Sequence, residues 1–133
     1  MDFSGTWKVY SEENLNEFLK AVVSIHLKGV PEMVARMRQG VKPVIVIKQN
    51  GKDFTYTMKT PVFTRENTFT IGKESEILSA DGRKIKCIVR EQNGKLVFET
   101  DKFISIKEIQ GEELVETSTA GSVSFISRSK RAC

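Results

Sequence analysis

The sequence contains few residues that could bind a metal or form a disulfide. It has two cysteines, Cys87 and Cys133, and a single histidine, His26. A structural zinc site needs four ligands, usually from cysteine and histidine, so these three residues make no plausible set. Cysteines in a protein that stays in the cytosol are expected to be reduced thiols. We therefore predict no metal, no other cofactor and no disulfide.

Long apolar runs are also lacking. No stretch approaches the ~20 residues that a membrane-spanning helix needs. The first ten residues, MDFSGTWKVY, show neither the basic start nor the apolar centre of a signal peptide. The composition, with 39% hydrophobic and 29% charged residues, is ordinary for a water-soluble protein. We predict one cytoplasmic domain over residues 1–133, which is long enough to bury a core without disulfides.

Neither sign of charge dominates the chain. The net charge is +4, and acidic residues are interleaved with basic ones. This mild excess suits anionic ligands or membrane surfaces, but it forms no basic stripe typical of nucleic-acid binders. A nucleic-acid-binding β-barrel would also expose aromatic side chains between basic ones, and it stands as a remote alternative. An enzyme would need a nucleophile with a base, or a metal cluster, so we expect no catalysis.

Helical periodicity is confined to residues 14–40. Asn14, followed three positions later by Glu17, resembles a capping box. The apolar residues that follow recur at the spacing of one helical face: Leu15, Phe18, Leu19, Val22 and Val23. Pro31 suits the first turn of a second helix, and Gly40 suits its end. The segment therefore predicts two short helices joined by a brief polar link.

The rest of the chain alternates between apolar and polar residues. From residue 44 onward, short alternating segments are separated by turn residues at roughly the 8–12-residue spacing of a barrel or sandwich. Asn50-Gly51 and Asn93-Gly94 are strong hairpin signals. With a first strand around Trp7, the pattern predicts about ten antiparallel strands. Two short helices can close one end of a barrel, and a barrel of this size can enclose a ligand.

The last strands place polar side chains where a dry core would not accept them. One predicted face carries Phe103, Ser105, Lys107 and Ile109, and another carries Val123, Phe125, Ser127 and Ser129. A dry core avoids lysine and paired serines, whereas a water-containing cavity accepts them. Alternation alone leaves two interpretations of Lys107: it faces a cavity, or it faces bulk water.

Several segments spread over the whole chain share one family pattern. They are FSGTWKV at 3–9, FTIGKE at 69–74, DGRK at 81–84 and NGKLV at 93–97. Together they resemble the intracellular lipid-binding protein family, the fatty-acid-binding proteins. The segments KIKC at 84–87 and SRSKR at 127–131 are most similar to its liver-type branch, especially the liver basic or bile-acid-binding proteins.

The resemblance implies a fold and a function. The fold is mainly β: a ten-stranded antiparallel up-and-down barrel, the clam of the calycins, with a helix-turn-helix lid between strands 1 and 2. The function is a non-catalytic, monomeric carrier in the cytoplasm that binds fatty acids or bile acids in an internal cavity. A carrier specific for bile acids or another bulky lipid is the alternative, and no nucleic acid is expected as a partner.

The resemblance also implies an anion site, in altered form. Members of the family commonly carry an inward arginine on the last strand and a tyrosine or serine two residues later, but these places hold Ser127 and Ser129. Arg128 is one residue away, so alternation points it outward. The preceding inward position, arginine in many members, is Lys107. We expect Lys107 to face the cavity without a charged partner, beside hydroxyls of Ser105, Ser127 and Ser129 that bind the ligand or ordered water.

Other candidates would form the ligand entrance and the cavity wall. The entrance set is Phe18, Met33, Met37 and Phe63, with packing of helix on barrel as the alternative for Phe18 and Met33. The wall set is Tyr56, Met58 and Phe125. The basic residues of the lid are Lys20, Lys28, Arg36 and Arg38. They would bring the lid into transient contact with anionic membranes, or they are ordinary solvated charges.

Overall fold

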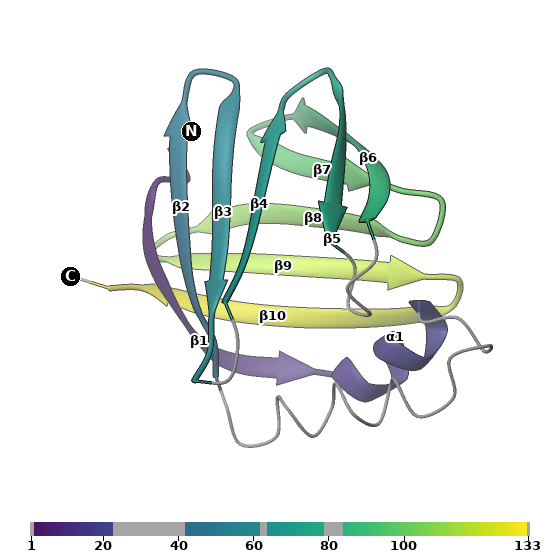
Figure 1. Cartoon of the computed structure of the whole chain (residues 1–133). Helices are drawn as coiled ribbons and strands as arrows, with labels where there is room; N and C mark the ends of the chain where they lie inside the picture. Colours follow the sequence, from purple (N-terminus) through teal and green to yellow (C-terminus); the bar gives the residue numbers. More distant parts are fainter. Residues whose placement is uncertain (1, 23–41, 62–63, 79–83, 133) are drawn as a thin grey trace.

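The structure is a computed structural model, and it describes residues 2–22, 42–61, 64–78 and 84–132 (Figure 1). The second predicted helix lies outside the described residues, as do three candidate ligand residues, Met33, Met37 and Phe63.

Ten strands form one antiparallel sheet with a simple up-and-down order. Their bounds are β1 Gly5–Glu13, β2 Val44–Asn50, β3 Asp53–Lys59, β4 Thr64–Thr70, β5 Glu74–Leu78, β6 Lys84–Gln92, β7 Lys95–Glu99, β8 Ile104–Gln110, β9 Glu113–Ala120 and β10 Val123–Arg131. Strands that follow each other in sequence pair with each other, with the exception of β4 and β5. In addition, β1 pairs with β10. The predicted ten-stranded fold is confirmed.

The barrel is nearly closed. The strand order begins at β4 and ends at β5, so these two strands have no hydrogen-bonded ladder between them. They nevertheless lie next to each other, joined by the turn at 71–73 (Figure 1). The Gly72 N–H donates to the carbonyl of Val89 across the turn at 2.8 Å, which ties the turn to β6. The predicted up-and-down barrel is therefore closed by hydrogen-bonded ladders everywhere among the described strands except at this junction.

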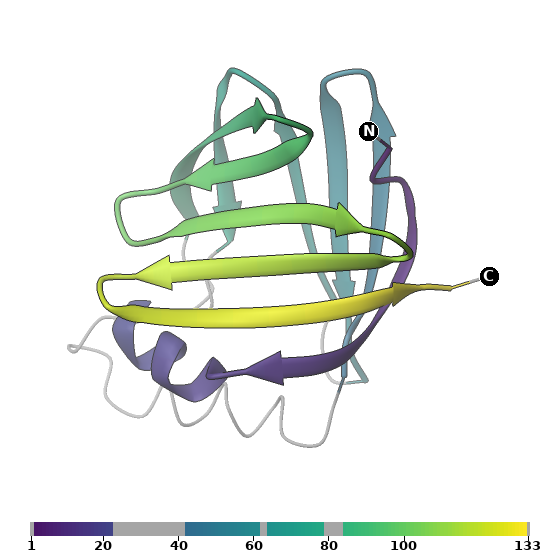
Figure 2. The same ribbon diagram turned by 180° about the vertical axis from the view of Figure 1, so that it is seen from behind.

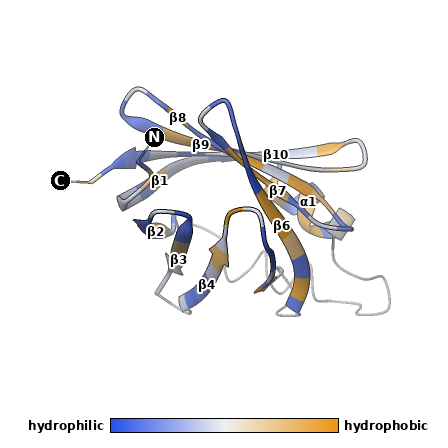
Figure 3. Cartoon of the chain, turned by 90° about the horizontal axis from the view of Figure 1, so that it is seen from above, coloured by the Kyte–Doolittle hydropathy of each residue, from blue (hydrophilic) through white to orange (hydrophobic). Residues whose placement is uncertain are grey.

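Strict alternation creates the core. Along β6, whose colours switch between hydrophilic and hydrophobic in Figure 3, every second side chain from Ile85 to Val89 is buried. Period-two alternation sends these side chains to one face of the sheet, and curvature of the sheet makes that face the interior. The main cluster gathers Phe3, Trp7, Val9, Ile45, Ile47, Phe54, Phe69, Cys87, Val89, Leu96, Phe98 and Leu114.

A β-bulge in β1 determines which residues at the end of this strand, just before the helix, face the interior. The register of β1 on β10 shifts between Val9 and Ser11, so Tyr10 is the extra residue. After the bulge, Glu12 lies opposite Ser127. Without it, the face of every following residue of β1 would be reversed.

Helix α1, Leu15–Val22, follows β1 directly and lies beside β10 (Figure 2). The Phe18 N–H donates to the carbonyl of Asn14 at 3.1 Å and closes the first turn. Asn14 itself has a positive φ of 69°, and its side-chain amide donates to the carbonyl of Ser124 at 3.1 Å. The predicted capping residue thus anchors the start of the helix to the beginning of β10. No described helix is long and apolar enough to cross a membrane.

Cys87 supplies a test of this interior. It is a free thiol with 1% exposure, and burial raises its pKa to about 11. At pH 8 the thiolate fraction would then be about one in a thousand, a tenfold drop per pKa unit, and the reagent would also lack access. In the Cys133→Ser variant we expect no reaction with a thiol reagent at pH 8 until denaturant is added, when one thiol should react. Rapid reaction of the native variant would contradict the inward orientation of the Cys87 side chain on β6.

Candidate functional site

The predicted polar face does point into the barrel. Ser105 and Lys107 on β8 are buried, and Ser127 and Ser129 on β10 are buried. Lys107 is 9% exposed and Ser129 is 0% exposed. The intervening residues of β8, Ile104 and Ile106, are exposed instead. Of the two interpretations of Lys107, exposure to bulk water is therefore wrong and the inward position is confirmed.

We had expected Lys107 to have no charged partner, but the structure gives it one. Its Nζ lies 2.8 Å from Oε2 of Glu116, and both side chains are about nine-tenths buried, at 11% and 10% exposure. The two residues lie directly opposite each other on β8 and β9. Directly opposed residues on one face of an antiparallel pair have adjacent Cβ atoms, which explains the contact. Glu116 is thus a central site residue that the sequence analysis missed.

A sequence signal for Glu116 was available. The turn Gln110-Gly111 joins β8 to β9, and Gln110 pairs with Glu113. A hairpin turn fixes the register, so counting back from it brings Lys107 opposite Glu116. Period-two alternation along β9 also places Glu116 on the same face as Leu114.

Aromatic rings surround this ion pair. The Tyr56 hydroxyl on β3 donates to Oε1 of Glu116 at 3.1 Å, with Oε2 at 3.4 Å. The Lys107 Nζ lies 4.8 Å from the centroid of the Tyr56 ring and 4.9 Å from that of Phe98. A cation over an aromatic face is attracted by the ring quadrupole, and the attraction grows when water is excluded. Contacts across the interior thus join β3 to β7, β8 and β9.

Serine hydroxyls lie around the ion pair. Ser127 is opposite Glu116 on β10. Two residues along each strand from the ion pair, the Ser118 hydroxyl donates to the Ser105 hydroxyl at 3.0 Å. The Oγ of Ser129 is the one buried side-chain N or O atom of the described residues without a hydrogen-bond partner. Buried hydroxyls normally find a partner, so Ser129 marks a place where a polar group of a ligand or a water molecule would be stabilised.

The remaining candidates occupy two places. Tyr56 and Met58 alternate with Thr57 on β3, and they share the face of the buried Phe54. Phe125 packs against Phe18 of α1, with ring centroids 5.8 Å apart, and Phe18 also meets Phe103 at 5.7 Å. The contacts of Phe18 match the packing alternative. A role for Phe18, Phe125 or Met58 in binding a ligand stays a prediction.

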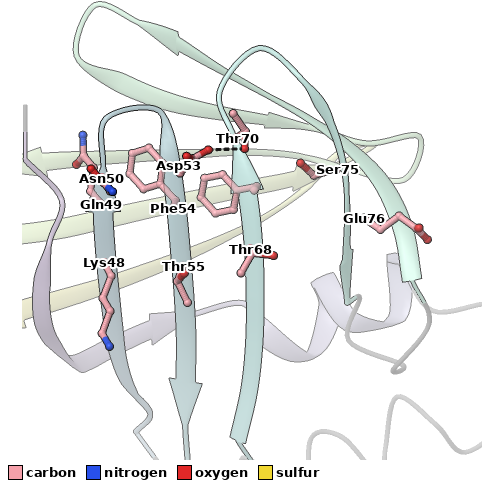
Figure 4. A pocket seen from close by; sticks show the side chains of 11 residues that line it. Lys48, Gln49, Asn50, Asp53, Phe54, Thr55, Thr68, Thr70, Ser75 and Glu76 are labelled. Carbon is pink, nitrogen blue, oxygen red and sulfur yellow. Dashed lines mark hydrogen bonds between the residues drawn. The ribbon is translucent and has the colours of Figure 1, made fainter.

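A hollow of about 630 Å³ lies beside the junction of β4 and β5 (Figure 4). Its walls combine Lys48, Thr55 and Thr68, a row of paired positions on the outer face of β2, β3 and β4, with the core rings of Phe54 and Phe69. The Thr70 hydroxyl donates to Oδ1 of Asp53 at 2.7 Å on its rim. None of the predicted ligand residues lines it. Among the described residues, no group of three or more His, Cys, Asp or Glu could hold a metal ion.

The ion pair predicts an asymmetric response to mutation. Lys107→Met should leave the buried Glu116 carboxylate without its cation and destabilise the protein by about 3 kcal/mol, near the value for breaking a buried pair. Lys107→Met with Glu116→Leu removes both charges, so it should cost much less or even stabilise. Urea unfolding of the wild type, the single variant and the double variant measures the difference. Equal losses in the single and double variants would show that the unpaired Glu116 carboxylate is not the source of the destabilisation.

Comparison with known proteins agrees with this geometry. The residue pattern of the lipocalin / cytosolic fatty-acid binding protein family matches residues 1–133. The liver fatty acid-binding protein of Schroederichthys bivius is 47% identical, with 98% of this chain and 99% of the relative covered. Gastrotropin of Oryctolagus cuniculus is 39% identical, with 98% of each covered.

Solved structures give the same result. The zebrafish ileal bile-acid-binding protein in complex with cholic acid superposes with a TM-score of 0.79 at 36% identity, with 98% of each chain covered. A fatty acid transporter, REP1-NXSQ, superposes with a TM-score of 0.88 at 25% identity, covering 99% of this chain and 97% of that one. The full-length match in sequence and the shared barrel agree, and the chain belongs to the lipocalin / cytosolic fatty-acid binding protein family.

Proposed function

We propose that this protein is a non-catalytic carrier that holds a fatty acid or a bile acid inside its barrel. The observation that carries the proposal is the polar cluster of Lys107, Glu116 and Tyr56, which lies with several serines among the apolar side chains of the barrel interior. An apolar cavity with a few fixed polar groups is the usual design of a lipid site. The names of the relatives, fatty acid-binding protein and gastrotropin, point to the same ligand classes.

A carrier specific for bile acids is the second candidate. The structure similar to this chain at 36% identity holds cholic acid. The inward positions of β10 carry Ser127 and Ser129, which are short and leave more room than an arginine. Short side chains in a cavity favour a bulky ligand over a straight chain, because voids in a binding site lose contacts with a thin ligand.

We further propose the setting in which the carrier acts. It would be a cytoplasmic monomer with a single domain over residues 1–133 and no nucleic-acid partner. The basic residues of the lid would make transient contact with anionic membranes. One of them, Lys20, lies 3.6 Å from Glu17 on the same exposed helix face, so its charge is partly offset. Membrane attraction would therefore depend on the other basic residues of the lid.

Binding inside the barrel predicts a difference between inward and outward substitutions on one strand. Ser118 is buried on the inward face of β9, and its neighbour Thr119 is exposed. Ser118→Phe should fill part of the cavity and weaken binding of oleate and cholate at least tenfold, whereas Thr119→Phe should leave both affinities unchanged. Calorimetry on protein stripped of lipid measures the dissociation constants, after urea unfolding has shown that both variants fold.

Two results would contradict the proposal. One is the failure of the wild-type protein to bind either ligand. The other is an equal effect of the two substitutions, which would place the ligand outside the barrel. Burial of the ligand in an apolar site should also give a negative heat-capacity change on binding.

A further inference from the structure

The Lys107–Glu116 pair is an unusual polar anchor, because it carries no net charge. A ligand carboxylate that approaches the Lys107 ammonium also approaches the Glu116 carboxylate, since the two groups are 2.8 Å apart. Attraction and repulsion of similar strength then largely cancel. To gain a full ion pair, the ligand would have to displace Glu116 and leave that carboxylate buried without its cation, which is costly. The pair is therefore a poor site for a simple carboxylate.

The same pair retains hydrogen-bonding capacity of both kinds. An ammonium has three N–H donors, and a carboxylate has about four acceptor sites. Lys107 directs one donor to Glu116, while Glu116 accepts from Lys107 and from the Tyr56 hydroxyl. Spare donors on Lys107 and spare acceptor sites on Glu116 thus lie side by side. A hydroxyl group matches this arrangement, because it accepts one hydrogen bond and donates another.

The residues around the ion pair favour its contact with a polar group partway along the ligand. In the row of facing residues, Leu96 lies on one side of Lys107, and Ser127 lies on the far side of Glu116. The next row toward the β8–β9 turn is apolar at Ile109 and Leu114. A lipid lying along this wall would contact Ile109 and Leu114 on one side of the polar row. On the other side it would contact the rings of Phe98 and Phe125, which flank the paired Ser105 and Ser118. Hydrogen-bonding groups within the body of the lipid, and not just its charged end, can therefore reach the pair.

We propose that the Lys107–Glu116 pair recognises a hydroxyl group on the body of the ligand, so the carrier prefers hydroxylated lipid acids to acids whose sole polar group is the carboxylate. The proposal rests on the function proposed above, that the barrel holds lipid. It assigns ligand selection to Glu116 and Lys107 together and gives each a role. Lys107 donates to the hydroxyl oxygen, and Glu116 accepts the hydroxyl hydrogen.

The test uses two ligand pairs that differ in hydroxylation. Stearate is compared with 12-hydroxystearate, and 5β-cholanate with cholate, so that chain and steroid shapes are each controlled. For each pair, the preference is the Kd of the plain acid divided by the Kd of the hydroxylated acid. Three proteins are measured by calorimetry: the wild type, the Lys107→Met/Glu116→Leu variant, and the Lys107→Glu/Glu116→Lys variant, which exchanges the charges and keeps the ion pair.

The expected result is a preference that falls at least tenfold in the first variant, because a buried hydroxyl then lacks its partners. The plain acids should lose much less affinity in that variant than the hydroxylated acids, since apolar burial supplies most of their binding free energy. The charge-exchanged variant should keep most of the preference. If it does not fold, the comparison of the wild type with the first variant decides alone.

The measurements distinguish failure of the hydroxyl proposal from failure of the carrier function. An unchanged preference in the Lys107→Met/Glu116→Leu variant, with all four ligands bound, would overturn the hydroxyl proposal and leave the carrier function standing. A selective loss of the plain acids in that variant would also overturn it, because it would show that Lys107 holds the carboxylate. A wild-type protein that binds none of the four ligands would overturn the carrier function and this inference with it.

Discussion

The ion pair between Lys107 and Glu116 imposes the main constraint on this barrel. Two opposite charges, each about nine-tenths buried, are stable there only if they remain in contact and are further hydrogen-bonded. The strand register supplies the contact, and Tyr56 from the opposite side of the interior supplies a further hydrogen bond. Any rearrangement that slides β8 against β9 would separate the charges. The site and the fold therefore depend on the same register.

Closure of the sheet through its two chain ends maintains that register. β1 pairs with β10, and the Arg131 guanidinium lies 4.2 Å from the centre of the Trp7 ring while donating to the carbonyl of Ser4 at 2.7 Å. Trp7 is fully buried, so this contact covers the closed part of the core. The pairing of β1 with β10 joins the two halves of the sheet, and it leaves the β4–β5 junction as the one place among the described strands where adjacent strands lack a ladder. The hollow lined by Lys48, Thr68 and Phe69 lies beside that junction.

Much of this architecture could be predicted from local sequence. Alternation and the hairpin dipeptides predicted the strands, and parity correctly placed Lys107 and the serines inside and Arg128 outside. The bulge at Tyr10 was not predicted, because one extra residue in a strand leaves little trace in a short alternating pattern. The faces of β8 and β10 alone do not reveal Glu116, because it is identified only when the register is carried across the turn onto β9. The absent ladder between β4 and β5 depends on how the whole sheet curves, which no local pattern encodes.

Both proposals require that the ligand lies inside the barrel against a neutral ion pair. A crystal structure of the protein with bound 12-hydroxystearate tests it most directly. We expect the lipid chain within the barrel and its hydroxyl oxygen within hydrogen-bonding distance of both the Lys107 Nζ and a Glu116 carboxylate oxygen, with the ion pair intact. A ligand bound against Lys48 and Thr68 on the outer face of the sheet, or a ligand carboxylate paired with Lys107 in place of Glu116, would show that the neutral ion pair does not hold the ligand.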